Sequence, residues 1–374
     1  MAISLQLESF KLTQFKNYES EQISCSPALT CFTGANGMGK TNLLDAIYYL
    51  CMGKSAFNTP DSQIARHGSD FFRLEGDFQR AGTREHIVAK VVPRKKKALE
   101  RNRLPYPKLS EHVGLLPVVM IAPDDTMLVQ EGSEVRRSLV DNTLSQIDPA
   151  YLSHLIAYQK LLQQRNALLK QFAEQRIFDK AMLEVYDQQM LRPAQVLYEA
   201  RSAFIEGFRP KVNAAYARIS GQAETVDCTF QSRLAQAPFG QLLEERRDKD
   251  RILQRTTAGP HRDDLVFSIG GYPLKRFASQ GQLKSFVLAL KLAQYQVLLE
   301  EKGLPPILLL DDLFDKLDPQ RVAQLLGFLR EQPFGQTFIT DTDPERMKTV
   351  AGQSDALHYQ ITKGKAARYP EKQI

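Results

Sequence analysis

Eight residues near the N-terminus have the types and spacing needed to hold a chain of phosphates. They read Gly34-Ala35-Asn36-Gly37-Met38-Gly39-Lys40-Thr41 and match the pattern G-x-x-x-x-G-K-[ST]. Glycines let the backbone curl so that successive N–H groups face a phosphate, and the N-terminus of the next helix adds positive potential. In this pattern Lys40 reaches the β- and γ-phosphates and Thr41 binds Mg²⁺. The run, with Asn42 after it, predicts binding of a nucleoside triphosphate.

Two adjacent carboxylates in the second half of the chain could complete this chemistry. Asp311 and Asp312 directly follow the apolar run 307–310, as in a buried strand that ends in a Walker B element. We expect Asp311 to hold Mg²⁺ opposite Thr41, and Asp312 to act with Lys40 in catalysis by polarising the attacking water. The alternative is a pair of solvated acidic caps after a strand.

A third group of residues lies at the start of a segment, 283–299, whose composition and spacing are helical. It reads Ser279-Gln280-Gly281-Gln282. Serine, glycine and free N–H groups at a helix start form an anion site, so we expect Ser279, Gly281 and Gln282 to contact a nucleotide, with Ser279 catalytic. Taken alone, such a serine is more often a simple N-cap, but its place shortly before the Walker B strand favours the functional interpretation.

The sequence also predicts the strands and helices that must position these residues. Residues 29–33 are rich in β-forming side chains, and Leu43, Ala46, Ile47 and Leu50 recur at helical spacing, so the phosphate-binding run joins a strand to a helix. An ordinary glycine turn is the weaker alternative. Between the two motif-bearing halves, a mostly helix-forming segment predicts helices over 135–143, 151–173, 178–203 and 204–219, with breaks at Pro149, Pro193 and Pro210.

Length and composition indicate a globular protein with two domains or lobes. The chain has 374 residues, 43% of them hydrophobic and 25% charged. No apolar run approaches the ~18 residues of a membrane helix, and the start lacks a basic, signal-like segment, so we expect a cytoplasmic protein without a membrane partner. The four cysteines show no C-x-x-C spacing for zinc or redox chemistry.

The charge balance favours a polyanionic partner. The formal net charge is +6 and the sequence pI is about 9.0. The densest basic cluster lies between a strand-like segment, 86–92, and a proline-containing stretch, 104–107, which suggests a hairpin tip. Its members, our candidate DNA contacts, are Arg94, Lys95, Lys96, Lys97, Arg101 and Arg103. A turn that is basic only for solubility is an alternative of equal weight.

Basic residues in the helix-forming segment are weaker candidates for contacts with a DNA backbone. They are Arg136, Arg137, Lys160, Arg165 and Lys170. For any one of them, a solvated helix face is the more common role.

The order of the motifs resembles an ABC-type ATPase head whose halves are separated by an insertion, as in the SMC class. Leu317-Asp318 follows the Walker B strand as in such heads. Because the insertion has only about 130 residues, without heptad repeats or a C-x-x-C hook, the chain resembles the RecF family of bacterial recombination mediators. Other runs that carry the resemblance are Phe15-Lys16-Asn17-Tyr18, 41–44, 117–119, 123–125, Arg136-Arg137, 164–169 and 259–265.

The resemblance implies an α/β fold in which an ABC-type P-loop ATPase head, residues 1–124 and 251–374, is split by a mainly helical lobe, 125–250. It implies ATP and Mg²⁺ as cofactors, slow hydrolysis, and a homodimer formed on ATP in which Ser279 and Gly281 act on the nucleotide of the other copy. It also implies binding of double-stranded DNA at gap junctions, and recombinase loading with the mediator proteins RecO and RecR.

The chain departs from the family pattern at several positions. Asn58 stands where an arginine is common, Lys316 reverses a charge, and no glutamine follows Met120, where Asp124 or Asp125 could orient water. His261 and Arg262 form either a structural turn or a polar contact near the nucleotide, and the polar tail 363–374 is expected to fray.

Two other functions remain open. One is an ABC-type ATPase that regulates a protein partner without DNA. The other is a P-loop small-molecule kinase, which would need an acceptor pocket and would have no use for Ser279.

Overall fold

The chain divides into two units, one of them discontinuous in sequence. A computed structural model describes residues 4–221, 224–313, 334–351 and 356–369. Unit 1 comprises residues 1–125 and 290–374, and unit 2 comprises residues 126–289. The insertion thus begins within one residue of the predicted position. It ends at 289 instead of 250, because strand β10 (Asp264–Ile269) pairs with strand β9 (Val226–Gln231) of unit 2.

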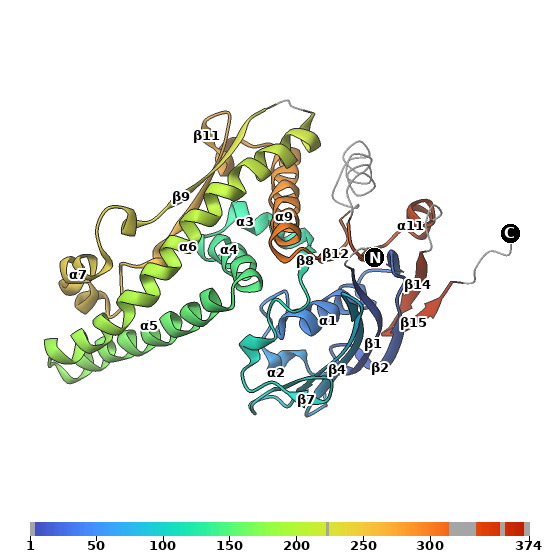
Figure 1. The fold of residues 1–374 in the computed structure, drawn as a ribbon, viewed down its shortest axis with the longest axis horizontal. Coiled ribbons are helices and arrows are strands. Elements are labelled where there is room, and N and C mark those ends of the chain that lie inside the picture. The colour runs from blue at the N-terminus through green and yellow to red at the C-terminus, as the bar shows by residue number, and fades with distance from the viewer. Residues whose placement is uncertain (1–3, 222–223, 314–333, 352–355, 370–374) are drawn as a thin grey trace. The chain divides into compact units, whose positions relative to one another are not determined.

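Unit 1 is built from two six-stranded sheets (Figure 1). The first is antiparallel, with strand order β2-β1-β4-β5-β6-β7, and the second, mostly parallel, has the order β15-β14-β3-β13-β12-β8. The strands are β1 (Leu5–Phe15), β2 (Tyr18–Ser24), β3 (Leu29–Thr33), β4 (Phe72–Arg80), β5 (Thr83–Val91), β6 (Ala98–Arg101), β7 (Leu104–Pro105), β8 (Val118–Ile121), β12 (Ile307–Leu310), β13 (Thr337–Asp341), β14 (Leu357–Thr362) and β15 (Lys365–Arg368).

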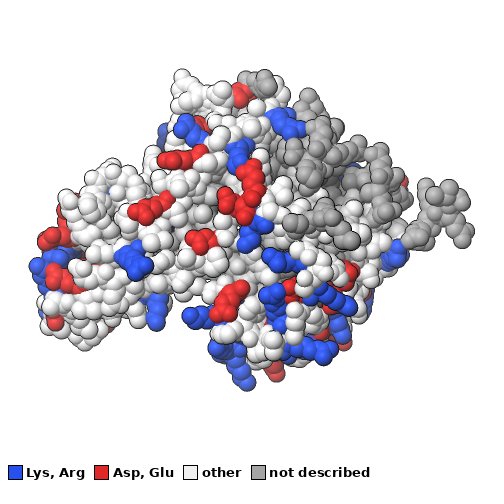
Figure 2. Space-filling model, in the orientation of Figure 1, with Lys and Arg blue, Asp and Glu red and all other residues white. Residues whose placement is uncertain are grey.

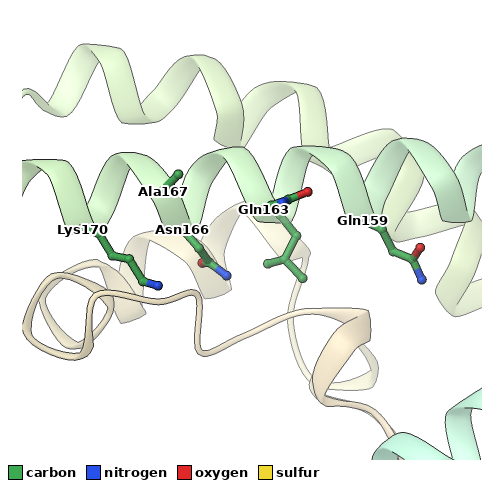
Figure 3. A pocket seen from close by; sticks show the side chains of 6 residues that line it. Gln159, Gln163, Asn166, Ala167 and Lys170 are labelled. Carbon is green, nitrogen blue, oxygen red and sulfur yellow. The ribbon is translucent and has the colours of Figure 1, made fainter. Parts of the chain in front are cut away.

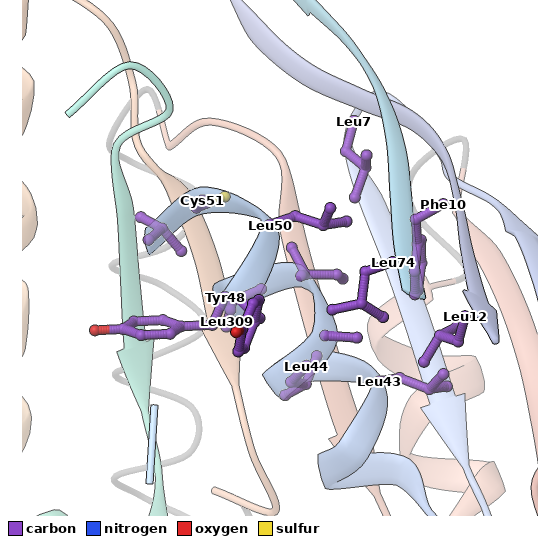
Figure 4. Packing of buried hydrophobic residues seen from close by; sticks show 14 of the residues in the cluster. Leu7, Phe10, Leu12, Leu43, Leu44, Tyr48, Leu50, Cys51, Leu74 and Leu309 are labelled. Atoms are coloured by element: carbon purple, nitrogen blue, oxygen red, sulfur yellow. The ribbon is translucent and has the colours of Figure 1, made fainter. Parts of the chain in front are cut away.

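Helix α1 (Lys40–Met52) lies between the two sheets and forms the centre of the unit 1 core (Figure 4). Leu7, Phe10 and Leu74 of the antiparallel sheet point toward it from one side, and Leu309 of β12 lies on the other. Strands β8 and β12 are apolar at every position and fully buried, as expected for parallel strands that are covered on both faces of the sheet. Within the described residues, the other α-helices of this unit are α2 (Asp61–Ile64), α11 (Pro344–Ala351) and the second half of α9 (Gln280–Lys302).

Unit 2 is mainly helical and carries a small antiparallel sheet of order β11-β10-β9, in which β11 spans Tyr272–Pro273. Its helices are α3 (Met127–Gln130), α4 (Ser133–Ile147), α5 (Pro149–Gln175), α6 (Lys180–Ser220), α7 (Phe239–Leu253), α8 (Leu274–Phe277) and the first half of α9. The breaks predicted at Pro193 and Pro210 are wrong, because α6 runs through both prolines. Its buried stripe, which includes Leu197, Ile205 and Val212, packs into the unit and offsets the backbone hydrogen bonds that proline removes.

Three of the arginines that were candidates for DNA contacts make polar contacts within unit 2. Arg165 is fully buried, with Nε 2.6 Å from Asp187 and Nη1 2.7 Å from Asp250, so the suggestion that it faces DNA is wrong. Arg136 binds Asp264 through both Nε and Nη2, at 2.7 and 3.0 Å. The remaining candidates divide: Arg137 donates to Ser133 and to a backbone carbonyl, whereas Lys160 and Lys170 are exposed.

Two further details concern membranes and the motif at residues 316–318. Among the described residues, no helix has the length and apolar character required to cross a bilayer. Lys316 and Leu317-Asp318 lie outside the described residues.

Burial of His112 in unit 1 predicts a pH dependence of stability. The imidazole donates from Nε2 to the Leu50 carbonyl at 2.7 Å and lies 3.2 Å from the Tyr106 hydroxyl, and burial lowers its pKa to about 4. Between pH 6.5 and pH 4, His112 is therefore protonated in the unfolded chain but neutral in the folded chain. The neutral, buried His112 contributes fully to the free energy of unfolding above pH 6.5, and this contribution is lost as the pH falls toward 4. We expect about 2 kcal/mol of loss between pH 7 and 5.

Urea unfolding of the native chain and of His112→Gln at both pH values checks this. The difference in free energy of unfolding between the native chain and His112→Gln should decrease by this amount from pH 7 to pH 5. His67→Gln, a change at an exposed histidine, should leave the difference constant. A gap that is the same at pH 7 and pH 5 for His112→Gln would contradict the expectation.

Candidate functional site

The predicted phosphate-binding run forms the loop between β3 and α1. Gly34, Gly37 and Gly39 have φ values of 155°, 78° and 111°, and α1 begins at Lys40. A Cβ on Gly34 would stand 2.4 Å from the Ile361 carbonyl oxygen, so both the backbone conformation and the packing require glycine there. Ala35, Asn36 and Gly37 are exposed on the rim of the loop. Such a loop, at the N-terminus of a helix, has the form of an anion cradle.

Lys40 holds its ammonium group over this loop. Its Nζ donates to the carbonyl oxygens of Gly34 at 2.9 Å and Ala35 at 3.4 Å, and lies 3.7 Å from Asp312 Oδ1. The side chain is only 3% exposed. A buried cation with weak carbonyl partners is well placed to exchange them for phosphate oxygens.

Asp311 meets Thr41 across a sequence separation of 270 residues. Thr41 Oγ1 donates to Asp311 Oδ1 at 2.9 Å, and Thr340 Oγ1 donates to the same oxygen at 2.8 Å. Burial raises the pKa of Asp311 to about 6, against the opposing effect of the two hydroxyl groups, and the charge of Asp312 adds to the rise. Hydroxyl and carboxylate oxygens are the ligands that Mg²⁺ prefers, so Thr41 and Asp311 fit the predicted cation site.

Asp312 is held in an unusual backbone conformation beside this pair. Its φ is 39°, in the left-handed region, and its N–H donates to Thr340 Oγ1 at 2.8 Å. The carboxylate is partly exposed and faces Lys40. A non-glycine residue in this region signals a constraint imposed by its surroundings, and here that constraint directs a carboxylate toward the phosphate loop.

Thr340 contacts both carboxylates and was not among the predicted site residues. The sequence shows Thr340-Asp341 only as polar residues directly after the predicted strand 337–339. Thr340 reaches the two carboxylates because β13 lies next to β12, and no local sequence pattern predicts this strand pairing. Asp125, suggested as a water-orienting residue, is instead 2.7 Å from Lys291 Nζ and accepts the Ala122 N–H.

Ser279, Gly281 and Gln282, which were predicted to contact a nucleotide, lie in unit 2. Ser279 and Gln282 form a capping box at the start of α9. Ser279 Oγ accepts the N–H of Gln282 at 3.2 Å, and Gln282 Oε1 accepts the N–H of Ser279 at 2.6 Å. Gln282 Nε2 also donates to Glu224 at 2.7 Å, so its side chain is occupied. The Ser279 hydroxyl keeps its own proton to donate, and the first-turn amides of Gln280 and Gly281 are the orphan donors of the helix. Ser279 and Gly281 therefore retain the chemistry of an anion site.

The predicted basic cluster divides into exposed and engaged residues. Lys97 Nζ donates to the Gly53 carbonyl at 2.8 Å and pairs with Asp61, while Arg101 is held by Glu85, with Nε at 2.7 Å. The exposed members, none of which has an ion-pair partner in the described part of the chain, are Arg94, Lys95, Lys96 and Arg103. Arg103 lies at the other end of β6 from the 92–97 turn, so the cluster is not a single tip. Figure 2 shows Lys and Arg gathered over the region of β7.

His261 serves the interior of unit 2. Its Nδ1 lies 2.6 Å from the Tyr158 hydroxyl and its Nε2 lies 3.0 Å from the Thr256 carbonyl oxygen, and burial lowers its pKa to about 4. Both ring nitrogens have partners within unit 2, which favours the structural interpretation of this turn. A shallow groove along α5 has a mostly apolar accessible surface and shows no set of reactive groups (Figure 3). It is lined by Gln159, Leu162, Gln163, Asn166, Ala167 and Lys170.

Comparison with known proteins agrees with this geometry. The RecF/RecN/SMC N terminal domain model matches residues 6–364. The chain is 43% identical to the DNA replication and repair protein RecF of Flavobacterium johnsoniae, over 92% of this chain and 96% of that protein. It superposes with a TM-score of 0.88 on a structure titled as the recombination mediator protein RecF-ATP in the RecFOR pathway, at 26% identity and 99% coverage of both chains. An Smc head domain from Pyrococcus furiosus shares the fold, with a TM-score of 0.56 at 17% identity, 98% coverage of this chain and 96% of that chain. The chain belongs to the RecF family, and its fold is that of an ABC-type ATPase head split by an inserted lobe.

Proposed function

We propose that this chain is an ATP-dependent DNA-binding protein of DNA replication and recombinational repair. The observation that carries the proposal is the 2.9 Å contact between Thr41 and Asp311, which joins the phosphate loop to the Walker B carboxylate in one buried site. Relatives at about the same length are DNA replication and repair proteins by name, and one solved relative is titled as an ATP complex. ATP is therefore the nucleotide that we assign to residues 34–42.

The residues of unit 1 supply the machinery for slow ATP hydrolysis. Thr41 and Asp311 would hold Mg²⁺, which neutralises phosphate charge when bound. Lys40 binds the phosphate oxygens, and Asp312 accepts a proton from the attacking water. Because Asp312 has a shorter side chain than glutamate, it reaches the water less well, and we expect slow turnover suited to timing.

A second copy of the chain is expected to complete the site. Ser279 and Gly281 present donors at a helix start in unit 2, while the phosphate loop lies in unit 1. In ABC-type heads these two parts belong to different subunits around one nucleotide. We therefore propose that ATP joins two copies, and that loss of the γ-phosphate releases them.

Size-exclusion chromatography with light scattering tests the ATP-dependent dimer. The native chain should change from monomer to dimer with ATP and Mg²⁺. Lys40→Ala should stay monomeric because it loses ATP, whereas Ser279→Arg should bind ATP and stay monomeric because the new side chain blocks the partner's phosphate. Ser153→Arg, at an exposed serine of α5, is the matched control and should dimerise.

A mixture of Lys40→Ala and Ser279→Arg sharpens this test. Each mixed dimer contains one intact composite site, formed by Lys40 of one copy and Ser279 of the other, so the mixture should dimerise although neither variant does alone. If the native chain remains monomeric with ATP and Mg²⁺, the dimer proposal is wrong.

Asp312→Asn should separate hydrolysis from assembly. The amide keeps the shape of the carboxylate but cannot accept a proton, so we expect turnover to fall by about 10²-fold while the ATP-bound dimer persists for longer. Single-turnover hydrolysis and dimer lifetime measure the two effects. Asp124→Asn changes an exposed carboxylate that the sequence also offered as a water-orienting residue, and it should leave both unchanged. If Asp124→Asn abolishes hydrolysis and Asp312→Asn does not, the assignment of the base is wrong.

Double-stranded DNA near single-strand gaps is the proposed nucleic-acid partner, with RecO and RecR as the proposed protein partners. Arg94, Lys95 and Lys96 are exposed and have no carboxylate partner in the part of the chain that the structure describes. This supports contacts with the DNA backbone, because such cations can neutralise phosphates. The 92–97 turn that carries them projects from the antiparallel sheet between β5 and β6.

Replacing Arg94, Lys95 and Lys96 together with alanine should weaken duplex binding at least about tenfold and reduce the salt slope of log K by up to ~3. Fluorescence anisotropy between 50 and 200 mM salt, with ATP present, measures both, in the range where backbone contacts change affinity most. The control replaces three exposed cations of unit 2, Arg176, Lys180 and Lys249. An equal loss in the control would show that overall charge, and not this turn, drives binding.

A further inference from the structure

The turn between β1 and β2 touches the phosphate loop at two points. Asn17 Nδ2 donates to the Met38 carbonyl at 2.9 Å, and Asn17 Oδ1 accepts from Asn42 Nδ2 at 2.8 Å. Met38 and Asn42 flank Gly39-Lys40-Thr41 in the chain. One amide side chain therefore bridges both ends of the segment whose backbone N–H groups would face a phosphate.

Close packing around Asn17 shows that this bridge is built into the site. A Cβ on Gly39 would stand 2.4 Å from Asn17 Nδ2, and a Cβ on Gly364 would stand 2.6 Å from the Asn17 carbonyl oxygen. Gly364, in the turn between β14 and β15, also donates its N–H to the Met38 carbonyl at 3.2 Å. The Met38 carbonyl thus accepts from two separate turns.

The backbone at Asn17 is anchored to the helix that the phosphate loop begins. The preceding residue, Lys16, has a φ of 49° and pairs with Asp45 of α1 at 2.6 Å. Asp45 is fully buried and also accepts from the Ser55 hydroxyl and the Ala56 N–H. The next residue, Tyr18, donates its hydroxyl to the Gly39 carbonyl at 3.0 Å. The side chain of Asn17 therefore reaches the loop from a fixed turn.

We infer that Asn17 is a positioning residue that preorganises the phosphate loop for its nucleotide through Met38 and Asn42. The inference rests on the proposed binding of ATP at residues 34–42. A loop that is already ordered loses less conformational freedom when it binds. Because the loop amides hold the phosphates in the ground state and the transition state alike, removal of the bridge weakens binding and leaves turnover at saturating ATP unchanged.

Hydrogen–deuterium exchange and calorimetry of Asn17 variants test the inference. In ATP-free Asn17→Ala, amides of the peptide covering 34–44 should exchange several-fold faster, and the affinities for ATP and ADP should fall together by about tenfold. Asn17→Asp should lose more, because its carboxylate repels the Met38 carbonyl and adds negative charge beside the phosphates. The maximal rate of hydrolysis should stay within twofold of the native value for Asn17→Ala.

Asn102→Ala is the matched control. Asn102, like Asn17, is an exposed asparagine at a hairpin turn of unit 1, and its side chain accepts the His86 N–H and donates to Glu85. It should leave loop exchange and nucleotide affinity unchanged.

Three results would overturn the inference or its basis. Unchanged loop exchange in ATP-free Asn17→Ala would overturn it even if affinity fell, since Asn17 would then act by touching the nucleotide. A loss confined to ATP, with ADP affinity intact, would overturn it as well. A native chain with no affinity for ATP would refute the proposed function instead, and calorimetry on the native chain separates that case.

Discussion

Parallel pairing of β3, β13 and β12 is the constraint on which the nucleotide site depends. The register sets Asp341 beside Thr33 and Leu310 beside Ile339, so the ends of three strands from distant parts of the sequence meet at one edge. Thr340 can then reach Asp311 and Asp312 at once. A slip of one residue in β12 would turn the Asp311 side chain to the opposite face of the sheet and away from Thr41. The fully apolar strands that fix this register are therefore as necessary to the site as its polar residues.

The contacts of Lys40 and Asp312 suggest how this edge responds to a nucleotide. In the structure the Lys40 ammonium lies near both Asp312 and the Gly34 carbonyl, so cation and carboxylate partly neutralise each other. A phosphate bound to the loop would compete with Asp312 and with the Gly34 carbonyl for the Lys40 ammonium. This exchange of partners would leave the phosphates open to donors from a second copy.

Local patterns in the sequence predicted the parts of the site that are contiguous. The phosphate loop and the strand before Asp311 are confirmed as elements because glycine spacing and apolar runs determine them directly. Contacts between distant segments could not be predicted in this way. Thr340 and Asn17 have roles only because of the elements that lie beside them. The polar tail illustrates the same limit, since residues 365–368 form a strand paired with β14 and do not fray.

Errors in the inserted lobe have a similar physical origin. Propensity predicts that Pro193 and Pro210 end a helix, yet α6 continues because burial along 41 residues outweighs two lost backbone hydrogen bonds. The boundary expected at residue 250 failed because strand pairing, and not composition, assigns β10 to unit 2.

Because some arginines are paired with carboxylates inside unit 2, the net charge of +6 does not by itself indicate where DNA would bind. Arg165 and Arg201 each bind two carboxylates, at least one of which is fully buried, so these guanidinium groups offset neighbouring charges and add little to the field outside the protein. In unit 1, Arg94, Lys95 and Lys96 lie exposed on one turn without carboxylate partners among the described residues. Their field reaches solvent and falls off over a Debye length, about 8 Å at physiological salt. The location of unpaired cations, and not the total charge, therefore determines where a phosphate backbone would bind first.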